Sequence, residues 1–248
     1  MRQEPLQALR AANRGAAPVA AAPALLLAGA TGVLGNEMLR RLAGSGHHGM
    51  VHLLAREPLT EGLRGVRCLV VTPEPDGNWP RVAARTGVIL FEPPRLFYDR
   101  ERALFTPRPD QLRAVAGWMR GCGATTLAVV LPHATGRLPE SLKRGLASLD
   151  EQHVAALGFD RVLFVRTAQK PAAAAAGGVL PRIARWMLST LQYMVPGSEQ
   201  PVRAVKVAEL VTLALQTAPS GIHVAAPELV WRAAQGNLPV TLAAWLGR

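Results

Sequence analysis

The sequence predicts one α/β domain built on a doubly wound parallel sheet, with a small helical cap at its C-terminal end. Apolar, strand-like runs alternate with amphipathic, helix-like segments through most of the chain. The first of these runs leads into a glycine-rich turn that opens a helix. About half of the 248 residues are hydrophobic, which is enough for a substantial core. We expect residues 1–22 to be a flexible leader and residues 23–248 to form a single domain, with the cap starting near residue 170.

The hydrophobic pattern sets the expected order of elements. Short apolar runs predict strands at residues 24–28, 51–55, 66–72, 88–91, 126–131 and 161–165. Amphipathic spacing predicts helices at residues 33–42, 110–120, 139–157, 179–195 and within 202–217. Because strands and helices alternate, the strands are expected to run parallel, with helices covering both faces of the sheet.

Composition and charge argue against nucleic-acid and metal partners. The formal charge is +11, but the arginines are scattered, and no helix-turn-helix, zinc or aromatic-platform pattern accompanies them. We therefore expect no nucleic-acid partner. Cys68 and Cys122 lie far apart without metal-ligand spacing, so we expect no metal site, no disulfide framework and a cytoplasmic protein. The N-terminal stretch resembles part of a signal peptide, but its apolar run continues into the glycine-rich turn, and no run approaches the roughly 20 apolar residues of a membrane span.

The glycine-rich turn at residues 29–35, GATGVLG, suits a bound diphosphate. The first N–H groups of a helix are unpaired donors and carry a partial positive charge. One glycine permits the tight turn, a second lets the backbone approach the phosphates, and a third lets the helix pack close to the strand. The residues expected to contact a dinucleotide are Gly29, Thr31, Gly32, Val33, Leu34 and Gly35. The alternative is a tight strand–helix turn that binds no nucleotide.

The end of the second predicted strand bears on the choice of cofactor. An acidic residue there favours the ribose hydroxyls of NAD, whereas a nearby arginine favours the extra phosphate of NADP. Arg56 directly follows the strand, and Glu57 comes one step later. We therefore predict NADP(H) in preference to NAD(H). The alternative for Arg56 is an ordinary solvated surface arginine.

The turn, the Ala-Arg end of the second strand and the run at residues 162–166 resemble the atypical short-chain dehydrogenase/reductases. Residues 199–210 are similar to a segment of the NmrA-like and sugar-nucleotide-epimerase-like members. Within that group the chain most resembles the small NAD(P)H-binding oxidoreductases related to the Tat-interacting protein. The resemblance spans about residues 25–226 and implies a Rossmann fold, an NADP(H) site and hydride transfer.

The resemblance also implies a serine or threonine after the fifth strand and a Tyr-x-x-x-Lys pair on the next helix, which perform acid/base catalysis. This chain departs from that pattern. Its two tyrosines, Tyr98 and Tyr193, lie elsewhere, and the family's tyrosine and lysine positions fall near Lys143 and Ala147. The remaining catalytic candidates are His133, Thr135 and Lys143. The ordinary alternatives are a loop histidine without a partner and a solvated helix lysine.

These observations lead to a predicted function with two rivals. The first prediction is an NADP(H)-binding, catalytically degraded member of the family that acts as a scaffold, accessory subunit or redox sensor. One rival is an active reductase or epimerase-like enzyme that uses other residues on a small carbonyl substrate. The other is a partner-binding protein without a nucleotide. The basic amphipathic helix at residues 179–195 is a candidate partner surface, although its apolar stripe also suits core or cap packing.

Overall fold

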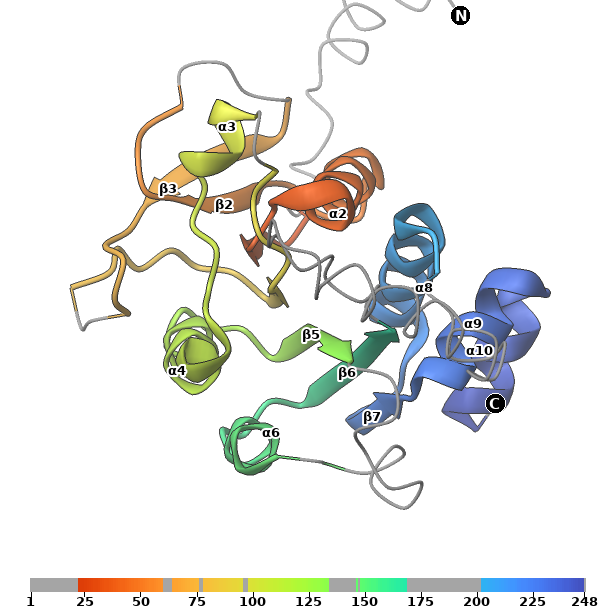
Figure 1. The fold of residues 1–248 in the computed structure, drawn as a ribbon. Coiled ribbons are helices and arrows are strands. Elements are labelled where there is room, and N and C mark those ends of the chain that lie inside the picture. Colours follow the sequence, from red (N-terminus) through yellow and green to blue (C-terminus); the bar gives the residue numbers. More distant parts are fainter. Residues whose placement is uncertain are drawn as a thin grey trace, which may run out of the picture.

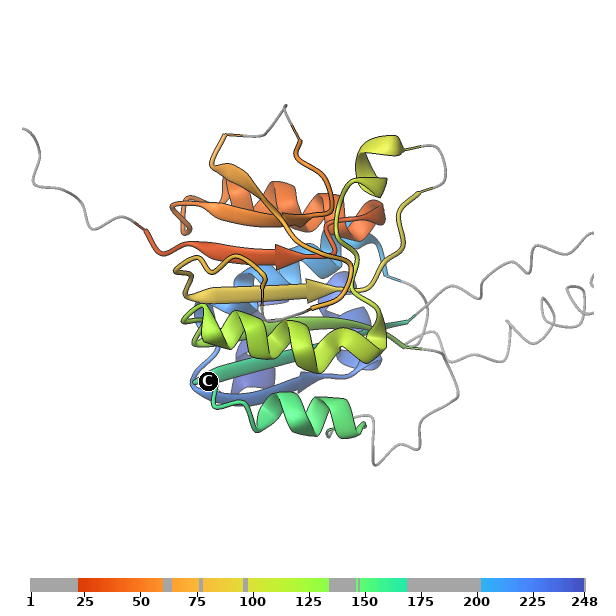
Figure 2. The same cartoon turned by 90° about the vertical axis from the view of Figure 1, so that its left-hand side faces the viewer.

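The structure, a computed structural model, describes residues 22–59, 64–75, 78–95, 98–133, 146, 148–168 and 202–247. Within them, seven parallel strands form one sheet in the order β3-β2-β1-β4-β5-β6-β7, and their arrows point the same way in Figure 2. The strands are β1 (Leu25–Ala28), β2 (Val51–Ala55), β3 (Val66–Val70), β4 (Thr86–Leu90), β5 (Thr126–His133), β6 (Arg161–Ala168) and β7 (Gly221–Ala225). The predicted fold class is confirmed. Because the strand order reverses between β1 and β4, their carboxyl ends form the switch point where ligands of such sheets bind.

Helices cover both faces of the sheet (Figure 1). One face carries α2 (Gly32–Gly44), α8 (Ala204–Thr217), α9 (Pro227–Gln235) and α10 (Leu238–Leu246). The other carries α4 (Leu112–Gly121) and α6 (Leu149–Ala155). Between β4 and α4 the chain forms the short helix α3 (Asp99–Arg102) and the 3-10 turn η1 (Pro109–Gln111). In Figure 2, α3 lies toward the edge to which the strand arrows point.

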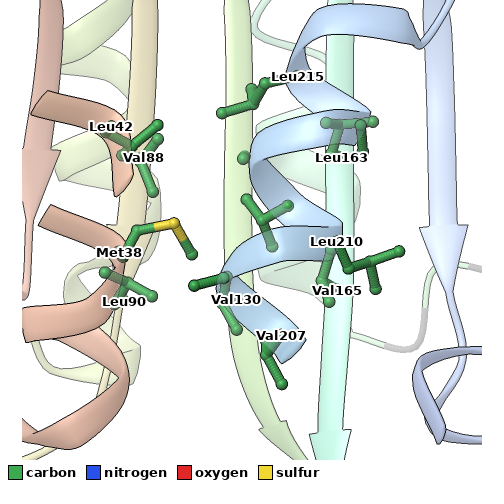
Figure 3. Packing of buried hydrophobic residues seen from close by; sticks show 14 of the residues in the cluster. Met38, Leu42, Val88, Leu90, Val130, Leu163, Val165, Val207, Leu210 and Leu215 are labelled. Carbon is green, nitrogen blue, oxygen red and sulfur yellow. The ribbon is translucent and has the colours of Figure 1, made fainter. Parts of the chain in front are cut away.

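Alternate strand residues feed two hydrophobic cores, one on each face. In β1, Leu25 and Leu27 face the α2 and α8 side, whereas Leu26 faces the α4 side. Figure 3 shows Met38 of α2 and Leu210 of α8 reaching toward the sheet from neighbouring helices. Since both faces of the central strands are covered, these strands read as continuous apolar runs rather than as alternating ones.

Some strands end at other residues than predicted, because backbone pairing with a neighbouring strand, and not hydrophobicity, decides where a strand ends. β3 ends at Val70 rather than at 72, whereas β5 and β6 extend past their apolar runs. The extension follows from their ladder, in which backbone pairing continues to His133 opposite Ala168. The hydrophobic pattern does not predict β7, because this strand lies at the edge of the sheet and its Ile222 is 48% exposed.

The C-terminal part is helical, as predicted, and α8 confirms the helix expected within residues 202–217. Residues 1–21 of the expected leader and the helix expected at 179–195 lie outside the described residues. Of the helix expected at 139–157, residues 139–145 and 147 also lie outside them. Its described part is α6, which begins only at Leu149, directly after the capping residue Ser148, and ends at Ala155 rather than at 157. Across the described ranges, no helix is both long and apolar enough to cross a membrane. The same residues contain no cluster of His, Cys, Asp and Glu suited to a metal ion, and both cysteines are free.

Candidate functional site

The glycine-rich turn joins β1 to α2 at the switch point. Gly29 and Gly32 adopt φ angles of +80° and +69°, which L side chains rarely tolerate. A Cβ on Gly29 would collide with the carbonyl oxygen of Leu90 in β4. A Cβ on Gly35 would lie 2.5 Å from the carbonyl carbon of Ala30. The three glycines therefore let the turn bend sharply and bring the start of α2 against the ends of β1 and β4.

Two carboxylates occupy the N–H groups at the start of α2. The Gly32 N–H donates to Oε2 of Glu101 at 2.9 Å, and the Leu34 N–H donates to Oε2 of Glu92 at 2.6 Å. The first turn of α2 contains no acidic residue of its own. The donors expected to hold a diphosphate are thus bound by side chains from α3 and from the segment after β4.

Glu101 is the more firmly held of the two carboxylates. It is 4% exposed, and its carboxylate also accepts hydrogen bonds from Asn36 Nδ2 at 2.7 Å and from the Arg95 N–H at 2.9 Å. Arg95 Nε donates to it at 2.7 Å. Burial alone would raise the pKa of Glu101, but the hydrogen bonds from Arg95 and Gly32 outweigh it and lower that pKa. The start of α2 therefore faces a stable negative charge.

The backbone just after α3 forms hydrogen bonds with the carboxyl ends of β1 and β2, next to the turn. The Arg56 N–H donates to the Ala103 carbonyl at 2.7 Å, and the Phe105 N–H donates to the Leu54 carbonyl at 3.1 Å. The Gly29 N–H donates to the Phe105 carbonyl at 3.0 Å. Phe105 is fully buried and meets Trp79 edge-on, with ring centroids 5.0 Å apart. Residues 103–105 are therefore anchored across the ends of β1 and β2.

The other predicted turn residues divide between structure and surface. Thr31 is fully buried, and its hydroxyl donates to the carbonyl of Glu92 and lies 3.1 Å from the hydroxyl of Thr106. Val33 is 55% exposed at the start of α2. Thr31 therefore ties the turn to the segment after β4, while Val33 stands at the surface.

A crevice of about 210 Å³ opens beside the turn, at the carboxyl ends of β4, β5 and β6. It is lined by Leu34, Phe91, Glu92, Pro93, Val130, Pro132, Thr167, Val202, Ala204 and Val207. Among the described lining residues, the polar side chains are Glu92 and Thr167, and the Thr167 hydroxyl donates to the Leu131 carbonyl at 3.4 Å. None of these lining residues is a tyrosine, lysine or histidine, so they supply no acid/base pair of the Tyr-Lys kind.

The structure places only some of the other predicted site residues. Arg56 directly follows β2 at the same edge as the turn; its side chain is exposed and forms no ion pair with a described residue. His133 is the last residue of β5, so its backbone reaches the carboxyl edge, but its side chain is not among the described parts. Thr135 and Lys143 lie outside the described residues, as does Tyr193. Tyr98 precedes α3 and stacks against Arg95, whose guanidinium carbon lies 3.6 Å from the ring centroid.

Sequence reasoning missed both carboxylates at the turn. Glu92 directly follows β4, next to Pro93 and Pro94 at the edge where a ligand is expected, and an acidic residue there was the available signal. Glu101 gave no such signal, because it sits in a run of charged residues that reads as a solvated surface. Its role depends on where α3 folds back, which the pattern does not reveal.

A buried ion pair lies on the opposite face near the same edge. Arg166 of β6 is 2% exposed, and its Nη2 lies 2.7 Å from Oε2 of Glu151 on α6. Ser148 caps α6 by accepting a hydrogen bond from the Glu151 N–H at 3.2 Å. This pair fixes the end of β6 to α6.

The scan against protein-family models finds no match, and the search of curated proteins finds none either. Among solved structures, WbmG of Bordetella bronchiseptica in complex with NAD is 13% identical with a TM-score of 0.44, covering 90% of this chain and 82% of that one. A nucleoside-diphosphate-sugar epimerase from Staphylococcus aureus is 14% identical with a TM-score of 0.47, covering 81% and 70%. A short-chain dehydrogenase/reductase superfamily protein from Agrobacterium tumefaciens with bound NAD is 12% identical with a TM-score of 0.45, covering 82% and 77%. At identities of 12–14% this likeness is one of fold alone.

Proposed function

We propose that this chain binds a nicotinamide dinucleotide at the switch point between β1 and β4, with NADP(H) preferred over NAD(H). The observation that carries this proposal is the glycine-rich turn. Gly29 and Gly32 have the positive φ angles, and Gly35 the close backbone contact, that a strand–turn–helix frame for a diphosphate requires. Arg56 supports the preference for NADP(H), because its exposed side chain follows β2 at the same edge.

In this proposal the Gly32 and Leu34 N–H groups hold the diphosphate, and the crevice beside β4 and β5 takes the nicotinamide half. Glu92 and Glu101 must leave those donors first, because a carboxylate and a phosphate both accept and cannot share one N–H group. The described residues that line the crevice offer binding surface and no Tyr-Lys pair.

We further propose that the chain is an atypical short-chain dehydrogenase/reductase of the NmrA-like kind whose Tyr-Lys catalysis is degraded. Its role would then be that of a scaffold, accessory subunit or redox sensor in the cytoplasm. The active-enzyme rival depends on His133, Thr135 or Lys143. Consumption of NADPH with a panel of small carbonyl compounds, abolished by His133→Ala or Lys143→Ala, would replace the degraded-catalysis proposal with that rival.

The binding proposal is tested by calorimetric titration of NADPH and NADH into the wild-type protein and into Arg56→Ala. We expect NADPH to bind more tightly than NADH, and Arg56→Ala to weaken NADPH by about tenfold or more while leaving NADH unchanged. Arg113→Ala is the matched control, because Arg113 is also exposed but lies on α4, away from the turn. Equal affinities for both nucleotides, unaffected by Arg56→Ala, would refute the preference.

One observation favours a second candidate, a partner-binding protein that holds no nucleotide. The turn donors are occupied by carboxylates, and residues 103–105 bond across the ends of β1 and β2. A retained Rossmann frame with its own side chains in the site would suit such a protein. The absence of heat with either nucleotide, for the wild type and for variants that remove the carboxylates, would favour this candidate.

A further inference from the structure

The two carboxylates at the turn come from unusual places. Ordinary capping groups belong to the residue before a helix or to its first turn. Here Glu92 and Glu101 reach α2 from 58 and 69 residues away in sequence. Both are brought in by the chain that follows β4, the strand next to the turn at the switch point.

Glu92 fills the space that glycine leaves open at the turn. A Cβ on Gly32 would collide with the carboxyl group of Glu92. In a dinucleotide site, the missing side chain at this position lets a diphosphate approach the backbone. Glu92 therefore stands where that approach would occur, and its Oε2 binds the Leu34 N–H as a phosphate oxygen would.

Glu101 is held in place by groups dedicated to it. Arg95 contacts its carboxylate through both the side chain and the backbone N–H, and Asn36 adds a hydrogen bond from within α2. Arg95 is in turn stacked on Tyr98. Such a set stabilises a buried charge that would otherwise be costly, so the carboxylate remains on the Gly32 N–H.

We propose that Glu92 and Glu101 are intramolecular competitors of the dinucleotide, which keep the turn closed until a diphosphate displaces them. This inference rests on the proposed dinucleotide binding and adds a regulation to the same site. Arg95 and Asn36 act as positioning residues for Glu101. A ligand with a negatively charged diphosphate meets both competition for the N–H groups and repulsion from two carboxylates.

Competition from the two carboxylates lowers the apparent affinity for the dinucleotide by a factor that can be estimated. The apparent dissociation constant equals the intrinsic one divided by the fraction of molecules whose turn is open. Each carboxylate makes a charge-assisted hydrogen bond to the turn, and weakening one such bond changes a binding constant by about tenfold or more. Removing either charge should therefore tighten dinucleotide binding by about tenfold.

The test is calorimetric titration of the full chain with NADPH and, separately, with inorganic pyrophosphate, which reports on the turn without the nucleoside parts. The variants are Glu92→Gln and Glu101→Gln. Glu37→Gln is the matched control, because Glu37 lies on α2 and pairs with Arg41 at 3.1 Å but does not contact the turn N–H groups. Glu92 is less buried than Glu101, so Glu92→Gln keeps the test valid if Glu101→Gln unfolds the protein.

We expect both probes to bind Glu92→Gln and Glu101→Gln about tenfold more tightly than the wild type, with Glu37→Gln unchanged. If the wild type binds NADPH and neither variant binds it more tightly, the competitor proposal is wrong while dinucleotide binding stands. If no protein binds NADPH but pyrophosphate binds the variants more tightly, the competition is real and the proposed function fails. If neither probe binds any variant, both proposals fail.

Discussion

Gly35 and Gly44 both lie in α2, and replacing each by alanine tests how closely α2 packs against the glycine-rich turn. A Cβ on Gly35 would lie 2.5 Å from the Ala30 carbonyl carbon and 2.7 Å from the Gly29 oxygen, both backbone atoms that cannot rotate away. A Cβ on Gly44, in the same helix, would meet nothing within 4 Å. Gly→Ala adds the same methyl group at both positions, so the difference reports on the contact with the turn.

The expected magnitudes follow from two opposing effects. Alanine is favoured over glycine in a helix by about 1 kcal/mol, and less at a helix end such as Gly44. Overpacking costs about 1–3 kcal/mol, and a collision with backbone belongs at the upper end of that range. We therefore expect Gly35→Ala to lower the free energy of unfolding by about 2 kcal/mol, and Gly44→Ala to raise it by about 0.5 kcal/mol. For a chain of this length, Gly35→Ala should then lower the Tm by about 4–8 °C.

The assay is urea unfolding of both variants and the wild type, followed by circular dichroism, with thermal melting as a second measurement. The two variants should differ by about 2.5 kcal/mol with unchanged m-values. If Gly35→Ala proves as stable as Gly44→Ala, α2 does not press against the turn in the way described. The frame that supports the diphosphate proposal would then be wrong.

Two further predictions concern ionisable side chains away from the turn. Glu151→Ala removes the carboxylate 2.7 Å from the buried Arg166 guanidinium and should lower the free energy of unfolding by about 3–5 kcal/mol. Lys206→Ala, which breaks the exposed pair with Glu209 at 3.1 Å, should cost less than about 1 kcal/mol, and equal losses in urea unfolding would refute the distinction. For the pH dependence, burial and the nearby Arg67 lower the pKa of His52, so the unfolded chain takes up the proton more readily than the folded one. Stability should therefore fall as the pH drops through about 6.5, His52→Leu should reduce this fall, and the same pH slope in both proteins would contradict the effect.

The sequence predicts the central sheet well because its strands are buried on both faces. Continuous apolar runs such as those of β1 and β5 leave little choice of structure, and the glycines at the turn mark where β1 ends. β7 escaped prediction because an edge strand with an exposed Ile222 lacks that pattern. Strand ends were less well predicted because backbone pairing with a neighbour, as between β5 and β6, carries a strand beyond its apolar residues.

The sequence predicts the backbone of the glycine-rich turn but not the side chains that bind its N–H groups. The spacing of Gly29, Gly32 and Gly35 indicated a sharp strand–helix turn, because other residues do not suit these positions. The occupation of that turn by Glu92 and Glu101 depends on contacts between segments far apart in sequence, and local patterns carry no information on such contacts. In the sequence, a glutamate that binds the N–H groups at the start of a helix cannot be told from a glutamate exposed to solvent.

The most direct test of dinucleotide binding follows the backbone amide resonances of Gly32 and Leu34 by NMR while NADPH is added to the wild-type protein. As the diphosphate replaces the two carboxylates on these N–H groups, both resonances should shift in a saturable way, whereas that of Gly44 at the far end of α2 should stay in place. If NADPH at saturating concentration leaves the Gly32 and Leu34 resonances where they were, the turn is not a diphosphate site.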